Sequence, residues 1–120
     1  MIGLLFTTAE EASYFANQHT GGRLDTIEEG LPVQIDDLII LATGHGKIKA
    51  TLSTERLLQE HEVDALLHDG TCTALDDELS LDTLVGAAFV LEGDRVELEA
   101  PTYPRMPLDH PVDIASEGTF

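Results

Sequence analysis

The residues best suited to chemistry stand where short polar segments follow apolar runs. Glu10-Glu11 comes soon after the apolar residues 1–6, residues 43–47 (Thr-Gly-His-Gly-Lys) follow the run 38–42, and residues 69–73 (Asp-Gly-Thr-Cys-Thr) follow the run 63–67. If these runs are strands of an α/β sheet, the polar segments stand at the carboxyl ends of strands, where such sheets bind ligands. These three segments therefore contain the candidate site residues.

Glu11 has two interpretations. Thr8 and Glu11 have the Thr-x-x-Glu spacing of a capping box, which is purely structural. A carboxylate close to a strand end can also act as a base on water. The residues alone favour the cap.

The other two segments are ambiguous as well. Backbone N–H groups at a helix start attract anions, and Lys47 would help, but a tight turn explains residues 44–46 more simply. Gly70 would let a ligand approach the backbone closely, and Thr71 offers a hydroxyl. His68 with Cys72 is only a weak signal for a nucleophile pair or metal site, and a lone cysteine is more often a small buried residue.

Apolar runs and helical spacing predict the elements that position these residues. We expect strands at 1–6, 23–27, 31–35, 38–42, 63–67 and 84–91, and a further strand at 95–98 that pairs with the last of these across a turn. We expect helices from Ala9 to the Gly21-Gly22 pair and over 47–61. This order is typical of an α/β fold. Prolines at 101, 104, 107 and 111 predict a C-terminal arm over 101–120, after a domain over 1–100.

Composition excludes several function classes. The 120 residues carry a net charge of −17, which disfavours nucleic-acid binding and a polybasic membrane contact. Because the acid is spread along a chain with ordinary hydrophobic content, we expect a halophilic protein whose self-repulsion is screened by molar salt. The single cysteine fits a reducing cytoplasm, and we see neither a signal peptide nor a membrane span. The histidines lack metal-ligand spacing, so we expect neither a metal nor a cofactor.

The segments 2–5, 10–11, 43–47 and 63–75 occur in an order that resembles the purine nucleoside phosphorylase and uridine phosphorylase superfamily. The resemblance covers residues 1 to about 95, and the branch that looks most similar is the 5′-methylthioadenosine/S-adenosylhomocysteine nucleosidases. It implies a three-layer α/β/α sandwich around a mixed central sheet, truncated to its N-terminal half. The implied reaction breaks the N-glycosidic bond of a purine nucleoside.

The resemblance also implies roles for individual residues. Glu11 matches the carboxylate that positions or activates the attacking water, and Thr71 matches the serine that contacts it. Cys72 and Thr73, next to Gly70, match small residues that line the base and ribose site. His45 falls near the 5′ substituent of the substrate.

Departures from the family pattern shape the functional expectation. His68 or Asp69 stands where phosphorylases have an arginine, and Asp69 would repel phosphate, so hydrolysis is favoured over phosphorolysis. The Met-Glu pair that grips the ribose and the Asp that protonates the base belong to the family's second half. We therefore expect a nucleosidase-like protein that is inactive or incomplete alone. The alternatives are a nucleoside-binding or interaction subunit, as a homodimer or with a partner chain that covers the open sheet face, and a remnant without a ligand.

Overall fold

The computed structural model describes residues 1–23, 26–74, 77–90, 103–104 and 116–119. Contacts within the chain group its residues into two compact units, Met1–Cys72 and Thr73–Phe120. The predicted boundary at residue 100 falls among residues 91–102, which lie outside the described part of the chain.

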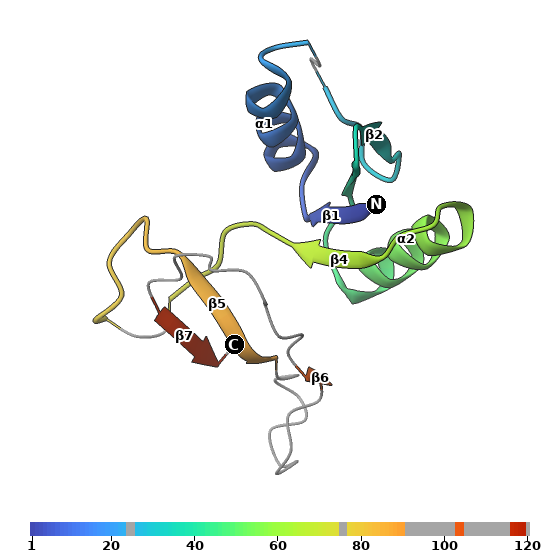
Figure 1. The fold of residues 1–120 in the computed structure, drawn as a ribbon. Coiled ribbons are helices and arrows are strands. Elements are labelled where there is room, and N and C mark those ends of the chain that lie inside the picture. Colours follow the sequence, from blue (N-terminus) through green and yellow to red (C-terminus); the bar gives the residue numbers. More distant parts are fainter. Residues whose placement is uncertain (24–25, 75–76, 91–102, 105–115, 120) are drawn as a thin grey trace. The chain divides into compact units, whose positions relative to one another are not determined.

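The first unit is a mixed α/β fold, as the order of elements predicted (Figure 1). Its four-stranded sheet has the order β2-β3-β1-β4, in which β1 pairs in parallel with both β3 and β4, and β2 pairs antiparallel with β3. Two helices connect the strands. The elements are β1 (Ile2–Phe6), α1 (Ala9–Thr20), β2 (Val33–Ile35), β3 (Leu38–Ala42), α2 (Lys47–Glu60) and β4 (Ala65–His68).

The core lies on both faces of β3, as its continuous apolar run predicted. Ile40 and Ala42 belong to a buried cluster on one face of the sheet, and Ile39 and Leu41 belong to a second cluster on the other face. All four side chains are at most 1% exposed. A strand that is covered on both faces needs apolar residues at every position rather than at alternate positions.

Each helix contributes to one of these clusters. Ala12 and Ala16 of α1 pack with the cluster that contains Ile40, and Leu57 of α2 packs with the cluster that contains Ile39. Because alanine side chains are small, α1 can approach the sheet closely. On the other face, the larger side chain of Leu57 fills the space between α2 and the sheet. The helices therefore cover opposite faces of the sheet.

The predicted helix ends are confirmed. Thr8 and Glu11 form both hydrogen bonds of a capping box, and Gly21 ends α1 in the left-handed conformation. The second helix begins after Gly46, which offers no side-chain cap, and ends at Glu60, with His61 as its C-cap.

The expected strand at residues 23–27 is not formed by its described residues. Residues 24 and 25 lie outside the described part, and Thr26 and Ile27 are not in a strand. Ile27 is nevertheless buried, and its N–H donates to the Ser13 hydroxyl at 2.8 Å. A side chain of α1 thus satisfies a backbone group that a neighbouring strand would otherwise have paired. Strand β2 is also shorter than the predicted 31–35.

The second unit contains a separate three-stranded sheet of order β6-β5-β7. Its strands are β5 (Val85–Val90), β6 (Tyr103–Pro104) and β7 (Ser116–Thr119), with β6 antiparallel and β7 parallel to β5. Two of these strands, β6 and β7, lie within the predicted C-terminal arm over 101–120. A proline is compatible with β6 because this strand lies at the edge of its sheet. The predicted strand at 95–98 lies outside the described residues.

Within the described part of the chain, no helix has the length and apolar character needed to cross a membrane.

Substitutions in α2 test this packing. Leu57 is 1% exposed and Leu52 is 60% exposed, although both are leucines of the same helix. We expect Leu57→Ala to lower the free energy of unfolding by about 2–5 kcal/mol, because it leaves a cavity beneath β1 and β3. The matched control Leu52→Ala should change it by less than about 0.5 kcal/mol. Urea unfolding in molar KCl measures both, and equal effects would contradict the assigned face of α2.

Candidate functional site

The three central strands bring their carboxyl ends to one edge of the sheet. Because β1 is parallel to both neighbours, the segments that follow all three strands start side by side. Backbone hydrogen bonds continue this alignment past the strand ends: the Thr43 N–H donates to the Phe6 carbonyl at 2.8 Å, and the Asp69 N–H donates to the Leu5 carbonyl at 2.9 Å. Segments that are distant in sequence therefore lie close together beside the start of α1.

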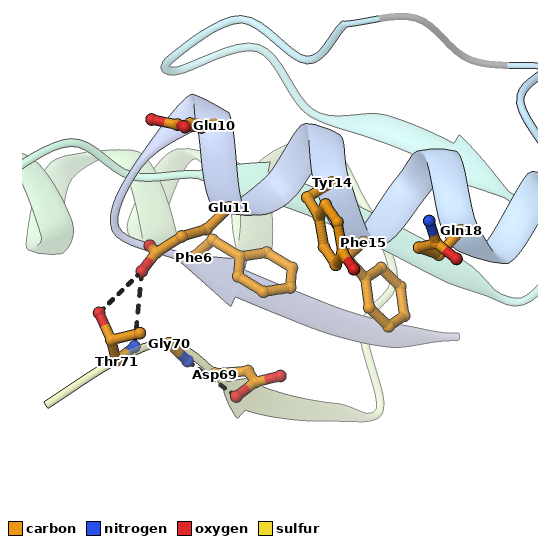
Figure 2. A pocket seen from close by; sticks show the side chains of 9 residues that line it. All are labelled: Phe6, Glu10, Glu11, Tyr14, Phe15, Gln18, Asp69, Gly70 and Thr71. Atoms are coloured by element: carbon orange, nitrogen blue, oxygen red, sulfur yellow. Dashed lines mark hydrogen bonds between the residues drawn. The ribbon is translucent and has the colours of Figure 1, made fainter. Parts of the chain in front are cut away.

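Glu11 and Thr71 meet at this edge, although 60 residues separate them. The Thr71 hydroxyl donates to Glu11 Oε1 at 3.2 Å, and the Thr71 N–H approaches the same oxygen at 3.5 Å (Figure 2). The other oxygen, Oε2, accepts from the Thr8 hydroxyl at 3.1 Å and from the Thr8 N–H at 3.3 Å. The capping box thus holds one oxygen and turns the other toward Thr71.

These hydrogen bonds set the charge of the site. Partial burial by itself raises the pKa of Glu11, but the bonds from Thr8 and Thr71 together outweigh it and leave that pKa below its ordinary value. Glu11 is therefore a carboxylate at neutral pH. It can orient a water molecule or a hydroxyl group, and both of its carboxylate oxygens accept hydrogen bonds from Thr8 or Thr71.

A cavity of about 540 Å³ opens beside this pair, along one side of α1. Its apolar wall consists of three aromatic rings, those of Phe6, Tyr14 and Phe15 (Figure 2). The Phe6 and Phe15 rings lie 5.6 Å apart and are tilted by 40°. The remaining lining residues are polar or small: Glu10, Glu11, Gln18, Asp69, Gly70 and Thr71.

No protein-family model and no solved structure matches this chain. The geometry of the first unit therefore carries the functional argument.

The structure brings together some of the predicted site residues and not others. Glu11, Gly70 and Thr71 line the cavity. His45 is exposed after the end of β3, and it is not among the described lining residues. The free thiol of Cys72 is exposed, so the expectation of burial is wrong. Thr73 belongs to the second unit. The substrate-binding roles of His45, Cys72 and Thr73 stay predictions.

The segment that begins α2 is best explained as a tight turn. Gly44 has a φ of +84°, and a Cβ atom there would lie 2.6 Å from Glu29 Oε1 and 2.8 Å from the Lys49 side chain. Glu29 and Lys49 form an ion pair at 2.6 Å across this turn. Position 44 therefore requires glycine, both because its φ is positive and because a Cβ atom would lie too close to the Glu29 and Lys49 side chains.

The histidine and cysteine beside the site do not form a metal centre. His68 stands beside Leu5 in the sheet and so faces the α2 side, whereas the rings of the cavity pack on the α1 side. Among the residues that the structure describes, no group of three or more His, Cys, Asp or Glu side chains is placed to hold a metal ion.

The aromatic wall of the cavity was not predicted from the sequence. Phe6 lies in the predicted strand 1–6, and Tyr14, Phe15 and Gln18 lie in the predicted helix that begins at Ala9, but none of them belongs to a recognisable motif. A signal was present, since residues 10, 14 and 18 and the pair 11 and 15 form a second stripe next to the buried one. Helical spacing alone cannot show which stripe borders a cavity.

Titration of Glu11 gives a test of this geometry. Its lowered pKa contributes stability that is present above the unfolded pKa of about 4.3 and is lost as pH falls through the folded value. Glu11→Gln can keep the capping box but does not titrate. We expect the stability advantage of the wild type over Glu11→Gln to shrink as pH falls from about 5 to about 3. Urea unfolding at each pH measures it, and an advantage that is constant or grows in acid would contradict the bonds to Glu11.

Proposed function

We propose that this chain is a nucleosidase-like protein that binds a purine nucleoside in the cavity beside α1. The observation that carries the proposal is the 3.2 Å contact between the Glu11 carboxylate and the Thr71 hydroxyl on the wall of an aromatic cavity. These are the two residues that the family resemblance assigns to the attacking water.

The cavity has the features that a nucleoside requires. Its volume of about 540 Å³ is in the range of small-molecule sites. The exposed ring of Tyr14 offers a face against which a planar base can stack, beside the Phe15 ring, which also contacts Phe6 and stacks with His19. Gln18 and Thr71 supply hydrogen-bonding groups at separate places on the wall, as a ligand with a base and a sugar needs (Figure 2).

The fold is compatible with the same proposal. Helices on opposite faces of a mixed sheet correspond to a three-layer α/β/α sandwich, and we propose that the first unit is such a sandwich. The site also lies at the carboxyl ends of parallel strands, between β1 and β4. The chain leaves β1 in one direction to form β3 and later crosses to the other side to form β4, which is the arrangement that creates a binding crevice.

We propose hydrolysis rather than phosphorolysis as the reaction type, with an incomplete catalytic set. Asp69 places a carboxylate on the cavity wall, where phosphate would be repelled. Cleavage of an N-glycosidic bond also needs protonation of the leaving base and stabilisation of a cationic sugar. Glu11 and Thr71 can orient water but do not supply an acid, so binding without efficient turnover is expected of this chain alone.

Ligand-induced stabilisation tests the proposed binding. We expect inosine or adenosine at about a hundred times its dissociation constant to raise the free energy of unfolding by about 2.7 kcal/mol. Phe15→Ala should weaken the binding, while Leu52→Ala, at an exposed position of α2, serves as the control. Chromatography of the same samples, with and without phosphate, should show little free base. If no purine nucleoside stabilises the protein in molar KCl, the proposed function is wrong.

A second candidate function is an interaction subunit, and exposed apolar residues on the first sheet favour it. Among the described strands, β4 is at the edge of its sheet and pairs with β1 alone. Leu67 and Ile2 lie on the α1 side of these two strands, beyond the helix, and are 39% and 38% exposed. Exposed apolar side chains at an open edge are typical of an interface. A homodimer or a partner chain there would lie next to the cavity.

Sizing in molar KCl tests this candidate. We expect a dimer at micromolar protein, and Leu67→Asp should shift it toward the monomer because the substitution places a charge in the interface. Leu52→Asp, on the exposed side of α2, is the matched control and should leave the dimer intact. A wild-type monomer at all concentrations would exclude self-association through this edge.

A further inference from the structure

The cavity beside α1 combines aromatic rings with carboxylates. Asp69 and Glu11 stand on one side of it, and the rings of Tyr14 and Phe15 on the other (Figure 2). Glu10 adds a third carboxylate to the lining. Among the nine described lining residues there is no lysine, arginine or histidine.

Each wall attracts positive charge for a different physical reason. An aromatic ring presents the negative face of its quadrupole, so an organic cation within about 6 Å of the ring centre is attracted. A carboxylate attracts the same cation directly and repels an anion. Glu11 remains ionised at neutral pH because the hydrogen bonds from Thr8 and Thr71 stabilise its charge.

From this arrangement we infer that the cavity selects ligands that carry a positively charged amine on a planar aromatic body, and that it excludes phosphorylated ligands. The inference rests on the proposed function in taking the ligand to be a nucleoside, and it adds the charge of the preferred nucleoside. The planar body packs against Phe15 and Tyr14, and the amine faces Asp69.

The overall charge of the chain is a competing cause that the experiment must separate. A protein of net charge −17 attracts any cation over a long range. That attraction is screened within about 3 Å at molar salt, whereas a contact inside the cavity persists. Binding is therefore measured in molar KCl, on the full chain, by isothermal titration calorimetry.

Two series of probes vary charge at constant ring structure. The nucleoside series is 5′-amino-5′-deoxyadenosine, adenosine and adenosine 5′-monophosphate, which are cationic, neutral and anionic. The indole series is tryptamine, tryptophol and indole-3-acetate, with the same order of charge. We expect the cation to bind most tightly and the anion least tightly in at least one series.

Two matched variants locate the effect. Asp69→Asn keeps an acceptor for the Gly70 N–H, which donates to Asp69 at 2.8 Å, but removes the charge from the cavity. Asp36→Asn removes the same charge from the turn before β3, at the opposite edge of the sheet, where Asp36 has a φ of +52° that asparagine tolerates. We expect Asp69→Asn to weaken binding of the cation by about two- to fivefold and Asp36→Asn to have no effect.

The outcomes separate this inference from the proposed function. If tryptamine shows the preference and no nucleoside binds, the cavity selects cations but the proposed function fails. If adenosine binds as tightly as its amino derivative and Asp69→Asn changes nothing, the proposed function stands and the inference is overturned. Binding of no probe in either series would overturn both, and would leave the cavity as a contact surface for another chain.

Discussion

The parallel pairing of β1 with both β3 and β4 is the constraint on which the first unit depends. It places three strand ends at one edge, so that segments separated by up to 60 residues in sequence become neighbours there. It also makes β1 and β3 central strands, which must be apolar on both faces. The buried residues of β3 and the site residues beyond the strand ends are therefore consequences of one topology.

Glu11 connects the stability of the fold with the chemistry of the site. Its capping-box bonds to Thr8 begin α1 at the correct residue, and the same bonds leave Oε1 directed at Thr71. A carboxylate held by four donors is charged and has little rotational freedom, as a group that orients water or a ligand requires. Because cap and site use different oxygens of one side chain, a structural role for Glu11 is no argument against a functional one.

Local patterns predicted the elements of the first unit well. The run Leu38–Ala42 predicted a doubly covered strand, and Thr8, Glu11 and Gly21 predicted both ends of α1, because caps and burial are encoded within a few residues. The predictions failed where contacts between residues distant in sequence determine the local structure. Ser13 satisfies Ile27 in place of a strand partner, and β5 pairs with β7 from the end of a proline-rich segment. Proline spacing cannot show which non-adjacent strands pair.

Some features of the site can likewise be predicted from local sequence patterns, whereas others depend on residues that are distant in sequence. Glu11, Gly70 and Thr71 could be singled out because polar residues after apolar runs mark strand ends, but their meeting depends on the strand order β3-β1-β4. The aromatic wall could not be predicted, because Tyr14 and Phe15 resemble the outer and inner residues of any amphipathic helix. Among the described residues of the first unit, no second helix lies over β4 on this side, and the two rings border the cavity. Within the first unit, α1 lies over β1 and β3 and α2 lies on the other face, so Leu67 of β4 is not covered by either helix. The two proposed functions therefore concern the same side of the sheet, because the cavity and Leu67 both lie on the α1 side.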